Sequence, residues 1–339
     1  MLNFGIISTA RINREAIFLP VANRDDVFVK AVASRNIDKA ESYSKIWGVP
    51  SFYGSYAELL EDPAIDAVYI STPNALHVTY VKQALLKNKH VLCEKPFSPT
   101  YSEAFDLVNL AKSRGLLLME AMHYACHPGV YQIINDLQDG KLGEIESIFV
   151  NLGINTPVEG DIRYRLDLMG GSFMHLGCYC LHFIQNTTNL SLKLDNIYAE
   201  RKNEQSADIL SVGNVQSETG LKFFFKTTFQ EQLLNSFVTI QGTKGSMTID
   251  SIFNPVSQQG DKFVDIIKVH SDVFNVDHLV SDACQSTYAS QLDVFVTSIK
   301  KGNLSPLVDC RYAALMEQGR KLLESSRVRT LPEIETLPS

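Results

Sequence analysis

The sequence predicts an α/β protein in two domains, the first built on a doubly wound parallel sheet and the second on an antiparallel or mixed sheet. Strand-like and helix-like segments alternate over roughly the first 120 residues, and strand-like segments then follow one another without helices between them. The chain has 339 residues, 45% hydrophobic and 20% charged, which suits two medium folded domains. The expected domains are residues 1–122 and 123–330.

The first domain is expected to contain βαβ units. Its predicted strands are Phe4–Ser8, Val27–Ser34, Ala67–Thr72, His90–Glu94 and Leu116–Met122. Its predicted helices are Asn13–Val21, Lys39–Trp47, Tyr56–Leu60, His77–Lys87 and Tyr101–Arg114. Apolar strands that alternate with helices indicate a parallel sheet with both faces covered.

The second domain is expected to contain longer strands joined by hairpins. Its predicted strands are Ile145–Leu152, Lys193–Arg201, Ala207–Asn214, Lys222–Gln230, Leu234–Gln241 and Ser246–Asp250. The run Gly242-Thr243-Lys244-Gly245 is typical of a tight hairpin connection. Helices Tyr288–Lys300 and Arg311–Ser325 close the chain, with apolar residues at helical spacing that we interpret as core positions.

Charge and composition argue against several classes of protein. The net charge is −7 and no long Lys/Arg block occurs, which disfavours a nucleic-acid partner. The N-terminus lacks the pattern of a signal peptide, and no apolar run approaches a membrane span. The six cysteines form no CxxC pair or zinc spacing, and His123 with His127 does not make a metal site. We therefore expect a cytoplasmic protein with reduced thiols, no metal and no membrane association.

The junction between the first strand and the first helix is a candidate cofactor turn. In a dinucleotide-binding fold this turn faces the pyrophosphate, and small residues let the backbone approach it. Ser8 and Ala10 stand where glycine is usual, so the motif is degraded, and an ordinary strand–helix turn is the alternative. The position at the first βα junction favours the cofactor interpretation. The expected cofactor-binding residues here are Gly5, Ser8, Thr9, Ala10, Arg11 and Ile12.

The end of the second strand bears on the choice of cofactor. An NAD site usually places an acidic residue there to bind the ribose 2′-hydroxyl, whereas this chain has Ser34 and Arg35. A guanidinium and a hydroxyl suit a 2′-phosphate. The alternative is that Arg35 is a solvated arginine at the start of a loop. We expect NADP(H), with NAD(H) possible.

Four sequence blocks resemble the Gfo/Idh/MocA family of NAD(P)-dependent oxidoreductases. The blocks are Thr72-Pro73-Asn74-Ala75-Leu76-His77, Glu94-Lys95-Pro96, Glu120 to Pro128, and Asp161-Ile162-Arg163 followed by Gly170 to Cys180. They resemble the family's TPNxxH turn, EKP, EAxxYRxHP and GGxxxDxGxY segments in that order. The last block is similar to the branch that contains dimeric dihydrodiol dehydrogenase, D-xylose dehydrogenase and glucose–fructose oxidoreductase.

The resemblance implies an N-terminal Rossmann domain and a C-terminal α/β domain with a large open, mainly antiparallel sheet. That sheet is often used for subunit contact, so the resemblance implies a homodimer or homotetramer. It also implies that a substrate sits between the domains over the nicotinamide.

The resemblance assigns Lys95 and Tyr179 to proton transfer, because they match the lysine of EKP and the tyrosine of GxY. A nearby ammonium lowers the pKa of a phenol, so the pair suits the oxygen at which hydride transfer builds charge. Pro96 matches a proline that follows a cis peptide, which would aim Lys95 into the cleft. Considered alone, Lys95 reads as a surface lysine and Tyr179 as a core tyrosine.

Other site residues follow from the same blocks. Glu94 is expected to position either Lys95 or the nicotinamide ribose. The family turn beside that ribose matches Thr72, Pro73, Asn74 and His77. His77 could equally cap the next helix. His123 and Arg163 are expected near the substrate, and a charged loop is the alternative for Arg163.

The chain departs from the family pattern at two positions. His175 stands where the family has an aspartate four residues before the tyrosine, and residues i and i+4 of a helix share a face. We therefore expect His175 beside Tyr179, able to bind a sugar hydroxyl or relay a proton, with a structural histidine as the alternative. Ala125 stands where related segments often carry arginine, which removes one substrate contact.

The leading functional hypothesis is an NADP(H)-dependent dehydrogenase or reductase acting on a sugar, polyol or dihydrodiol. A sugar-nucleotide ketoreductase is one alternative, and the missing arginine at position 125 counts slightly against it. A non-catalytic NADP-binding regulator is another, since function resides in the site and not in the fold. The presence of both Lys95 and Tyr179 favours an enzyme.

Overall fold

The computed structural model describes residues 1–22, 24–156, 160–253, 256–259, 262–273, 279–280, 286–325 and 329–330. The chain divides into two compact units. Unit 1 contains Met1–Tyr131, Val256–Asp265 and Ser281–Cys310. Unit 2 contains Gln132–Pro255, Ile266–Val280 and Arg311–Ser339. The boundary after residue 122 stays a prediction.

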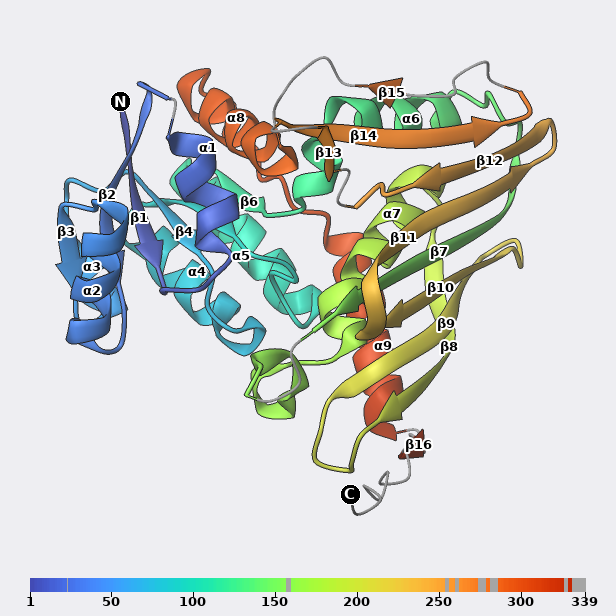
Figure 1. The fold of residues 1–339 in the computed structure, drawn as a ribbon, viewed down its shortest axis with the longest axis horizontal. Helices are drawn as coiled ribbons and strands as arrows, with labels where there is room; N and C mark the ends of the chain where they lie inside the picture. Colours follow the sequence, from blue (N-terminus) through green and yellow to red (C-terminus); the bar gives the residue numbers. More distant parts are fainter. Residues whose placement is uncertain are drawn as a thin grey trace. The chain divides into compact units, whose positions relative to one another are not determined.

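Unit 1 is built on a parallel sheet whose strand order is β3-β2-β1-β4-β5-β6 (Figure 1). The strands are β1 (Leu2–Ile7), β2 (Val27–Ala33), β3 (Ser51–Tyr53), β4 (Ala67–Ile70), β5 (His90–Cys93) and β6 (Leu118–Glu120). This is the doubly wound dinucleotide-binding order, so the predicted fold class is confirmed. Strand β3 was not predicted, because it has too few residues to show a pattern.

Two helices of unit 1 begin at ordinary side-chain capping signals. Asn36 accepts a hydrogen bond from Lys39 N at 2.9 Å, and Ser55 forms a capping box with Glu58. The helices are η1 (Arg14–Phe18), α1 (Leu19–Val21), α2 (Ile37–Trp47), α3 (Tyr56–Glu61), η2 (Asn74–Leu76), α4 (His77–Leu86), α5 (Tyr101–Arg114), η3 (His123–Cys126) and α8 (Thr287–Lys300). Helix α6 (Pro128–Gln138) was not predicted.

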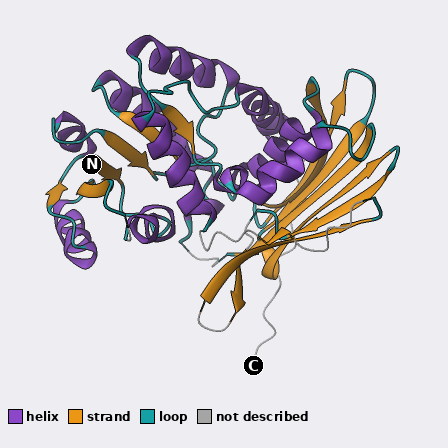
Figure 2. Cartoon of the chain, turned by 90° about the horizontal axis from the view of Figure 1, so that it is seen from above, coloured by secondary structure: helices purple, strands orange, loops and turns teal. Residues whose placement is uncertain are grey.

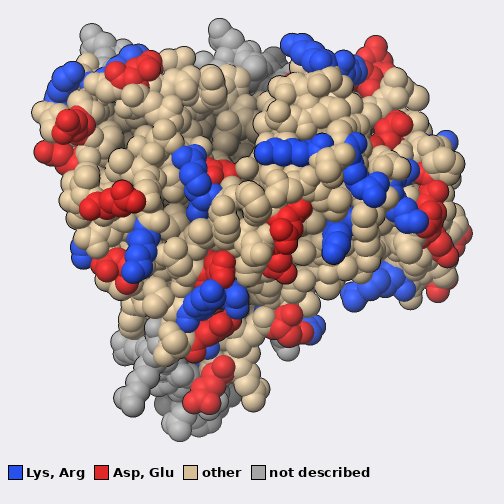
Figure 3. All heavy atoms as spheres, turned by 180° about the vertical axis from the view of Figure 1, so that it is seen from behind, with Lys and Arg blue, Asp and Glu red and all other residues tan. Residues whose placement is uncertain are grey.

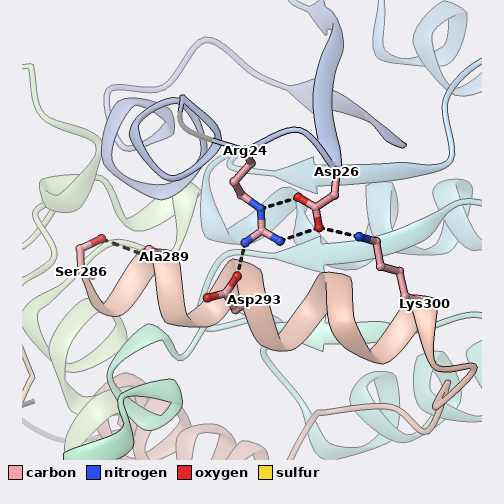
Figure 4. A network of polar contacts seen from close by, with 6 residues as sticks. All are labelled: Arg24, Asp26, Ser286, Ala289, Asp293 and Lys300. Carbon is pink, nitrogen blue, oxygen red and sulfur yellow. Dashed lines mark hydrogen bonds and ion pairs between the residues drawn. The ribbon is translucent and has the colours of Figure 1, made fainter. Parts of the chain in front are cut away.

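Helix α8 is distant in sequence but belongs to the core of unit 1. Leu292, Phe295 and Val296 are buried in the cluster that contains Phe4, and the Phe4 and Phe295 rings are 5.5 Å apart. Polar contacts at the edge of this core also hold α8, as Figure 4 shows. A helix from late in the chain therefore completes the N-terminal unit.

Unit 2 is built on an open, mainly antiparallel sheet, as predicted (Figures 1 and 2). Its strands run in the order β14-β12-β11-β7-β10-β9-β8-β16. Only the β7–β10 and β8–β16 pairs of this series are parallel. The bounds are β7 (Ile145–Asn155), β8 (Leu192–Arg201), β9 (Asp208–Ser217), β10 (Lys222–Thr228), β11 (Gln230–Gly242), β12 (Gly245–Asp250), β14 (Lys262–Ser271) and β16 (Arg329–Thr330).

Hairpins join several neighbouring strands of this region. Gly242 pairs with Gly245 where β11 turns into β12, which confirms the predicted hairpin. Strands β14 and β16 were not predicted, and neither were two further short strands. Strand β13 (Val256–Gln259) pairs with the start of β14, and β15 (Leu279–Val280) pairs with Ile266 and Ile267. The remaining helices are η4 (Ile162–Tyr164), η5 (Leu166–Leu168), η6 (Phe173–Gly177), α7 (Cys178–Thr188) and α9 (Cys310–Ser325).

One face of the protein mixes the two signs of charge. In the view of Figure 3, Lys and Arg side chains are interspersed with Asp and Glu side chains. None of the helices in the described ranges has the length and apolar character needed to cross a membrane.

Candidate functional site

The turn after β1 is held by a buried polar network around Ser8. Ser8 has φ +113°, a conformation that glycine adopts more readily than serine. Its Oγ accepts a hydrogen bond from Ala10 N at 3.0 Å and donates one to Ser71 O at 3.1 Å. Asn13 Nδ2 donates to Ser8 O at 3.0 Å, and Ser71 Oγ donates to Asn13 Oδ1 at 2.5 Å. Residues after the neighbouring strand and residues before the following helix thus fix both the side chain and the backbone of Ser8.

Asn13 and Ser71 were not among the predicted site residues. They lie 58 residues apart in the chain, and their only signals were the start of a helix and the end of a strand. Gly5 lies inside β1, where a side chain would meet Leu59 Cδ2 at 2.6 Å, so the structure gives this glycine a packing reason. The residues that follow the turn form a π-helix, η1, a form that often occurs at functional sites.

The end of β2 carries an exposed cation. Ser34 is buried and its Oγ accepts a hydrogen bond from Asn36 N at 3.4 Å. Arg35 is exposed, and its charge partly opposes the burial that raises the pKa of the Tyr56 phenol. No acidic side chain stands between residues 33 and 37. These residues fit a cofactor with a phosphate on its ribose.

The loop after β5 holds the EKP motif between buried side chains. The peptide bond between Lys95 and Pro96 is cis, as the resemblance implied. Tyr69 donates its phenol hydrogen to Glu94 Oε1 at 2.6 Å, and Phe97 N donates to Glu120 Oε1 at 3.0 Å. Burial raises the pKa of Glu94, against the lowering effect of the Lys95 ammonium. The loop is therefore anchored on both sides of Lys95.

His77 links this loop to the turn after β4. The side chain is fully buried, with Nδ1 2.9 Å from Pro96 O and Nε2 2.8 Å from Thr72 O. A neutral imidazole can donate to only one of these carbonyls. Burial lowers the pKa of His77, and Lys95 lowers it further. The side chain makes no cap for α4, so the alternative role considered for His77 is wrong.

The TPN turn contributes further buried polar groups. Thr72 and Asn74 are buried, and Pro73 is partly exposed. Thr72 Oγ1 has no hydrogen-bond partner among the described residues. An orphaned hydroxyl next to the EKP loop fits the binding of a polar cofactor at this edge of the sheet.

His123 meets the start of α8 at the same edge. Its Nδ1 lies 2.8 Å from Thr287 Oγ1, and its ring stacks on Tyr288 with centroids 4.1 Å apart. Burial first, and then the Lys95 ammonium, lower the pKa of His123 to about 3. Thr287 lies just before the predicted helix Tyr288–Lys300, and neither Thr287 nor Tyr288 was expected to have a functional role.

In unit 2, the segment that carries His175 is not an α-helix. His175 lies in the π-helix η6, and Tyr179 lies in α7, which follows it. The predicted helix around His175 is therefore π-helical at this point, and the expectation that His175 lies beside Tyr179 stays a prediction. The His175 ring is 6.4 Å from Phe229, whereas the Tyr179 ring is 5.6 Å from Phe253.

Arg163 is paired with a neighbouring carboxylate. Its Nη1 is 2.8 Å from Asp161 Oδ2, and its backbone N donates to Asp161 Oδ1 at 2.9 Å. The Arg163 side chain is 36% exposed. Among the described residues, no group of three or more His, Cys, Asp or Glu side chains could hold a metal ion.

Comparison with known proteins identifies the family. The model of the oxidoreductase family with an NAD-binding Rossmann fold, Gfo/Idh/MocA, matches residues 2–122. A dTDP-3,4-didehydro-2,6-dideoxy-alpha-D-glucose 3-reductase from Streptomyces antibioticus is 32% identical over 310 residues, 89% of each chain. The chain belongs to the Gfo/Idh/MocA family. The predicted resemblance and the predicted oxidoreductase class are confirmed. The cofactor of this oxidoreductase is a nicotinamide dinucleotide.

Other relatives within the family act on different substrates. The D-xylose 1-dehydrogenase (NADP(+)) 2 of Haloferax volcanii is 31% identical over 74% of this chain and 76% of its own. The trans-1,2-dihydrobenzene-1,2-diol dehydrogenase of Bos taurus is 33% identical over 75% and 76%. Among solved structures, the 3-ketoreductase KijD10 from Actinomadura kijaniata, in complex with NADP and TDP-benzene, has a TM-score of 0.82 at 23% identity and covers 98% of this Gfo/Idh/MocA chain and 99% of its own. This likeness supports the fold.

Proposed function

We propose that this Gfo/Idh/MocA oxidoreductase uses NADP(H) to interconvert an alcohol and a carbonyl on a sugar, polyol or dihydrodiol. The observation that carries the proposal is the anchored EKP loop, in which Tyr69 and Glu120 bond the residues on either side of Lys95. Such anchoring favours one position of the ammonium, which suits a group that must meet a developing negative charge.

The proposal assigns cofactor binding to unit 1. When bound, the nicotinamide supplies or takes up a hydride. The turn after β1, the end of β2, the TPN turn and Glu94 would hold the cofactor, and the exposed Arg35 favours a 2′-phosphate over a bare hydroxyl. A relative whose name includes NADP(+) supports the same choice.

Proton transfer is assigned to Lys95 and Tyr179. An ammonium stabilises an alkoxide or a phenolate, and a phenol with a lowered pKa can give and take a proton near neutral pH. His123 is neutral at that pH, because its pKa is lowered to about 3. It would contact the substrate through hydrogen bonds and not through charge. His175 and Arg163 are proposed as substrate contacts in unit 2.

A sugar-nucleotide ketoreductase is the second candidate. The observation that favours it is the 3-reductase from Streptomyces antibioticus, which matches 89% of this chain, more than the other two relatives described. The two candidates differ in what the substrate carries beyond the reacting sugar: a nucleotide diphosphate adds two negative charges and a base.

One assay separates the two candidates. NADPH oxidation and NADP⁺ reduction are measured across aldoses, polyols, dihydrodiols and dTDP-linked keto sugars. Turnover on the free sugars or diols supports the first proposal, and turnover on the dTDP sugars alone supports the second. Lys95→Met should lower kcat by at least about 100-fold with little change in NADPH affinity, whereas the exposed control Lys87→Met should match the wild type. Equal activity in Lys95→Met would remove the proton-transfer assignment.

We further propose that the outer face of the unit 2 sheet forms a homodimer or homotetramer contact. Tyr198 and Val212 are directly opposite each other on β8 and β9, and both are exposed, as is Phe224 on β10. A contiguous exposed apolar patch is typical of an interaction surface. Light scattering should find an oligomer for the wild type and a smaller species for Phe224→Glu; a monomeric wild type would contradict the proposal.

A further inference from the structure

The turn that precedes His175 and Tyr179 packs closely on two other segments of unit 2. Gly171 N donates to Arg163 O at 2.7 Å, and a side chain at Gly170 would lie 2.4 Å from the same oxygen. A side chain at Gly171, which has φ +113°, would lie 2.0 Å from Asp208 Oδ1. Both glycines are therefore needed for close approach of the turn to its neighbours.

The carboxylate of Asp208 holds the residues that follow these glycines. One oxygen, Oδ2, accepts three hydrogen bonds: from Ser172 Oγ at 2.7 Å, Phe173 N at 2.8 Å and Ser211 Oγ at 2.8 Å. Thr227 Oγ1 donates to Ser172 Oγ at 3.2 Å. Asp208 is 4% exposed. Strands β9 and β10 thus fix the point at which the π-helix begins.

This carboxylate is costly to bury. No lysine or arginine pairs with Asp208 in the part of the chain that the structure describes, and burial raises its pKa against the three hydrogen bonds. Aspartates are rarely fully buried without such a partner. A buried acid that makes no ion pair, at the base of a turn that carries two candidate site residues, suggests a role in placing that turn.

We propose that Asp208 is a positioning residue that sets the start of the π-helix, and through it the placement of His175 and Tyr179. The proposal rests on the proposed function, in which these two side chains meet the substrate. Asp208 would not touch the substrate; it would act through Ser172 and Phe173. The π-turn gives the reason that such control is needed, because its spacing of side chains differs from that of the α-helix that follows.

The first test needs no substrate. The ring Cε1–H signals of the histidines are recorded by NMR, and the His175 signal is assigned by its loss in His175→Gln. Asp208→Asn should move or broaden the His175 signal and leave those of His77 and His123, in unit 1, where they are. The control is Asp195→Asn, an exposed carboxylate on β8 of the same sheet, bonded to Asn214 and Lys222. It should change none of these signals.

The second test separates positioning from stability. NADPH titration gives the affinity and the fraction of binding-competent protein, and kcat is expressed per competent molecule. Asp208→Asn should lower kcat by about 100-fold, the effect of a displaced reacting group, with NADPH affinity within twofold. A merely structural role would lower the melting temperature and leave kcat per competent molecule unchanged, and that result would overturn the proposal.

The outcomes remain distinct in the less favourable cases. If the wild type turns over no substrate, the proposed function fails, whereas the NMR test of Asp208 still stands. If Asp208→Asn does not fold, Ser211→Ala replaces it, because it removes one of the three donors and keeps the acid. It should shift the His175 signal in the same direction and lower kcat by about tenfold. An unshifted His175 signal in the folded variant would overturn the proposal.

Discussion

Two turns in this protein have similar local structures but form them with different residues. Each contains a residue with φ +113°, Ser8 in unit 1 and Gly171 in unit 2, and each leads into a π-helix. Each is also held by a buried polar network that reaches a segment distant in the chain, through Ser71 just after β4 in unit 1 and through Asp208 on β9 in unit 2.

The difference lies in where the energetic cost falls. In unit 1 the residue with positive φ is a serine, so its backbone conformation is unfavourable, and the polar groups around it are uncharged. In unit 2 glycine removes the backbone cost, and the network contains a buried carboxylate. The first turn should therefore tolerate replacement of Ser8 by glycine. The second should not tolerate replacement of Gly171 by any larger residue.

The largest effect should follow from a side chain at the unit 2 turn. Gly171→Ala would place Cβ 2.0 Å from Asp208 Oδ1 at a φ that L-residues disfavour. We expect a loss of about 3 kcal/mol in the free energy of unfolding, measured by urea denaturation. Gly220→Ala, also at positive φ but with only Gln216 Nε2 nearby at 3.8 Å, separates the backbone cost from the clash. Equal losses in the two variants would show that the carboxylate does not restrict the turn.

Acid should lower the stability of the folded protein through the buried histidines of unit 1. The pKa of His123 falls from about 6.5 unfolded to about 3 folded, because burial and Lys95 oppose its charge. The unfolded state then binds more protons, so stability is present above pH 6.5 and is lost as the pH falls toward 3. The loss from His123 alone should reach about 2 kcal/mol at pH 5.

Thermal unfolding from pH 8 to pH 5 checks this sign. His123→Gln should flatten the pH dependence, and an equal slope in wild type and variant would contradict the lowered pKa. The contribution of the Asp208 carboxyl to stability changes with pH in the opposite direction. Its pKa is raised by burial, so its contribution to stability is present at low pH and is lost as the pH rises through the folded value.

At Ser8 the glycine variant should be more stable than the alanine variant, the reverse of the usual order of stability. Ser8→Ala keeps the disfavoured φ and loses the hydrogen bonds to Ser71 O and from Ala10 N, whereas Ser8→Gly loses the bonds but relieves the backbone. We expect the glycine variant to be more stable than the alanine variant by about 1 kcal/mol. At the exposed, helical Ser42 the alanine variant should be the more stable one. The same order at both positions would mean that Ser8 carries no strain.

The strands of unit 1 could be predicted from the sequence because they are buried on both faces. Such strands appear as continuous apolar runs, and β2 and β5 ended within one residue of their predicted ends. Only β3 was too short to see. In the second sheet the hairpin at Gly242 could be predicted from its turn residues, whereas β14 was missed.

The candidate site could be predicted only where its residues follow one another in the chain. The EKP loop has a sequence motif, but its anchors Tyr69 and Glu120 each lie more than twenty residues away. Thr287 reaches His123 across 164 residues. The π-turn at His175 was invisible because hydrophobic spacing does not distinguish a single π-turn from an α-helix.

The smallest effect should come from the exposed counterpart of the Asp208 network. Arg24 bonds Asp26 with its Nε and Nη2, at 2.8 and 2.9 Å, and also contacts Asp293 on α8, while Lys300 Nζ is 2.6 Å from Asp26 (Figure 4). Arg24 first, and then Lys300, lower the pKa of Asp26. This stabilisation is therefore present above about pH 4 and is lost as the pH falls through the lowered value.

Solvent screens this network, because the Asp293 side chain is 41% exposed and that of Lys300 is 51% exposed. Asp293→Asn should cost only about 0.5 kcal/mol, and less in high salt. A double-mutant cycle with Arg24→Met at two salt concentrations measures the coupling. A coupling between Arg24 and Asp293 as large as that between Asp208 and Ser211 would contradict the comparison. It would mean that a solvent-exposed carboxylate with nearby cations stabilises its segment as much as a buried carboxylate without cations does. The expected contrast follows from burial alone: water can replace the lost partner of Asp293, whereas it cannot reach the donors around Asp208.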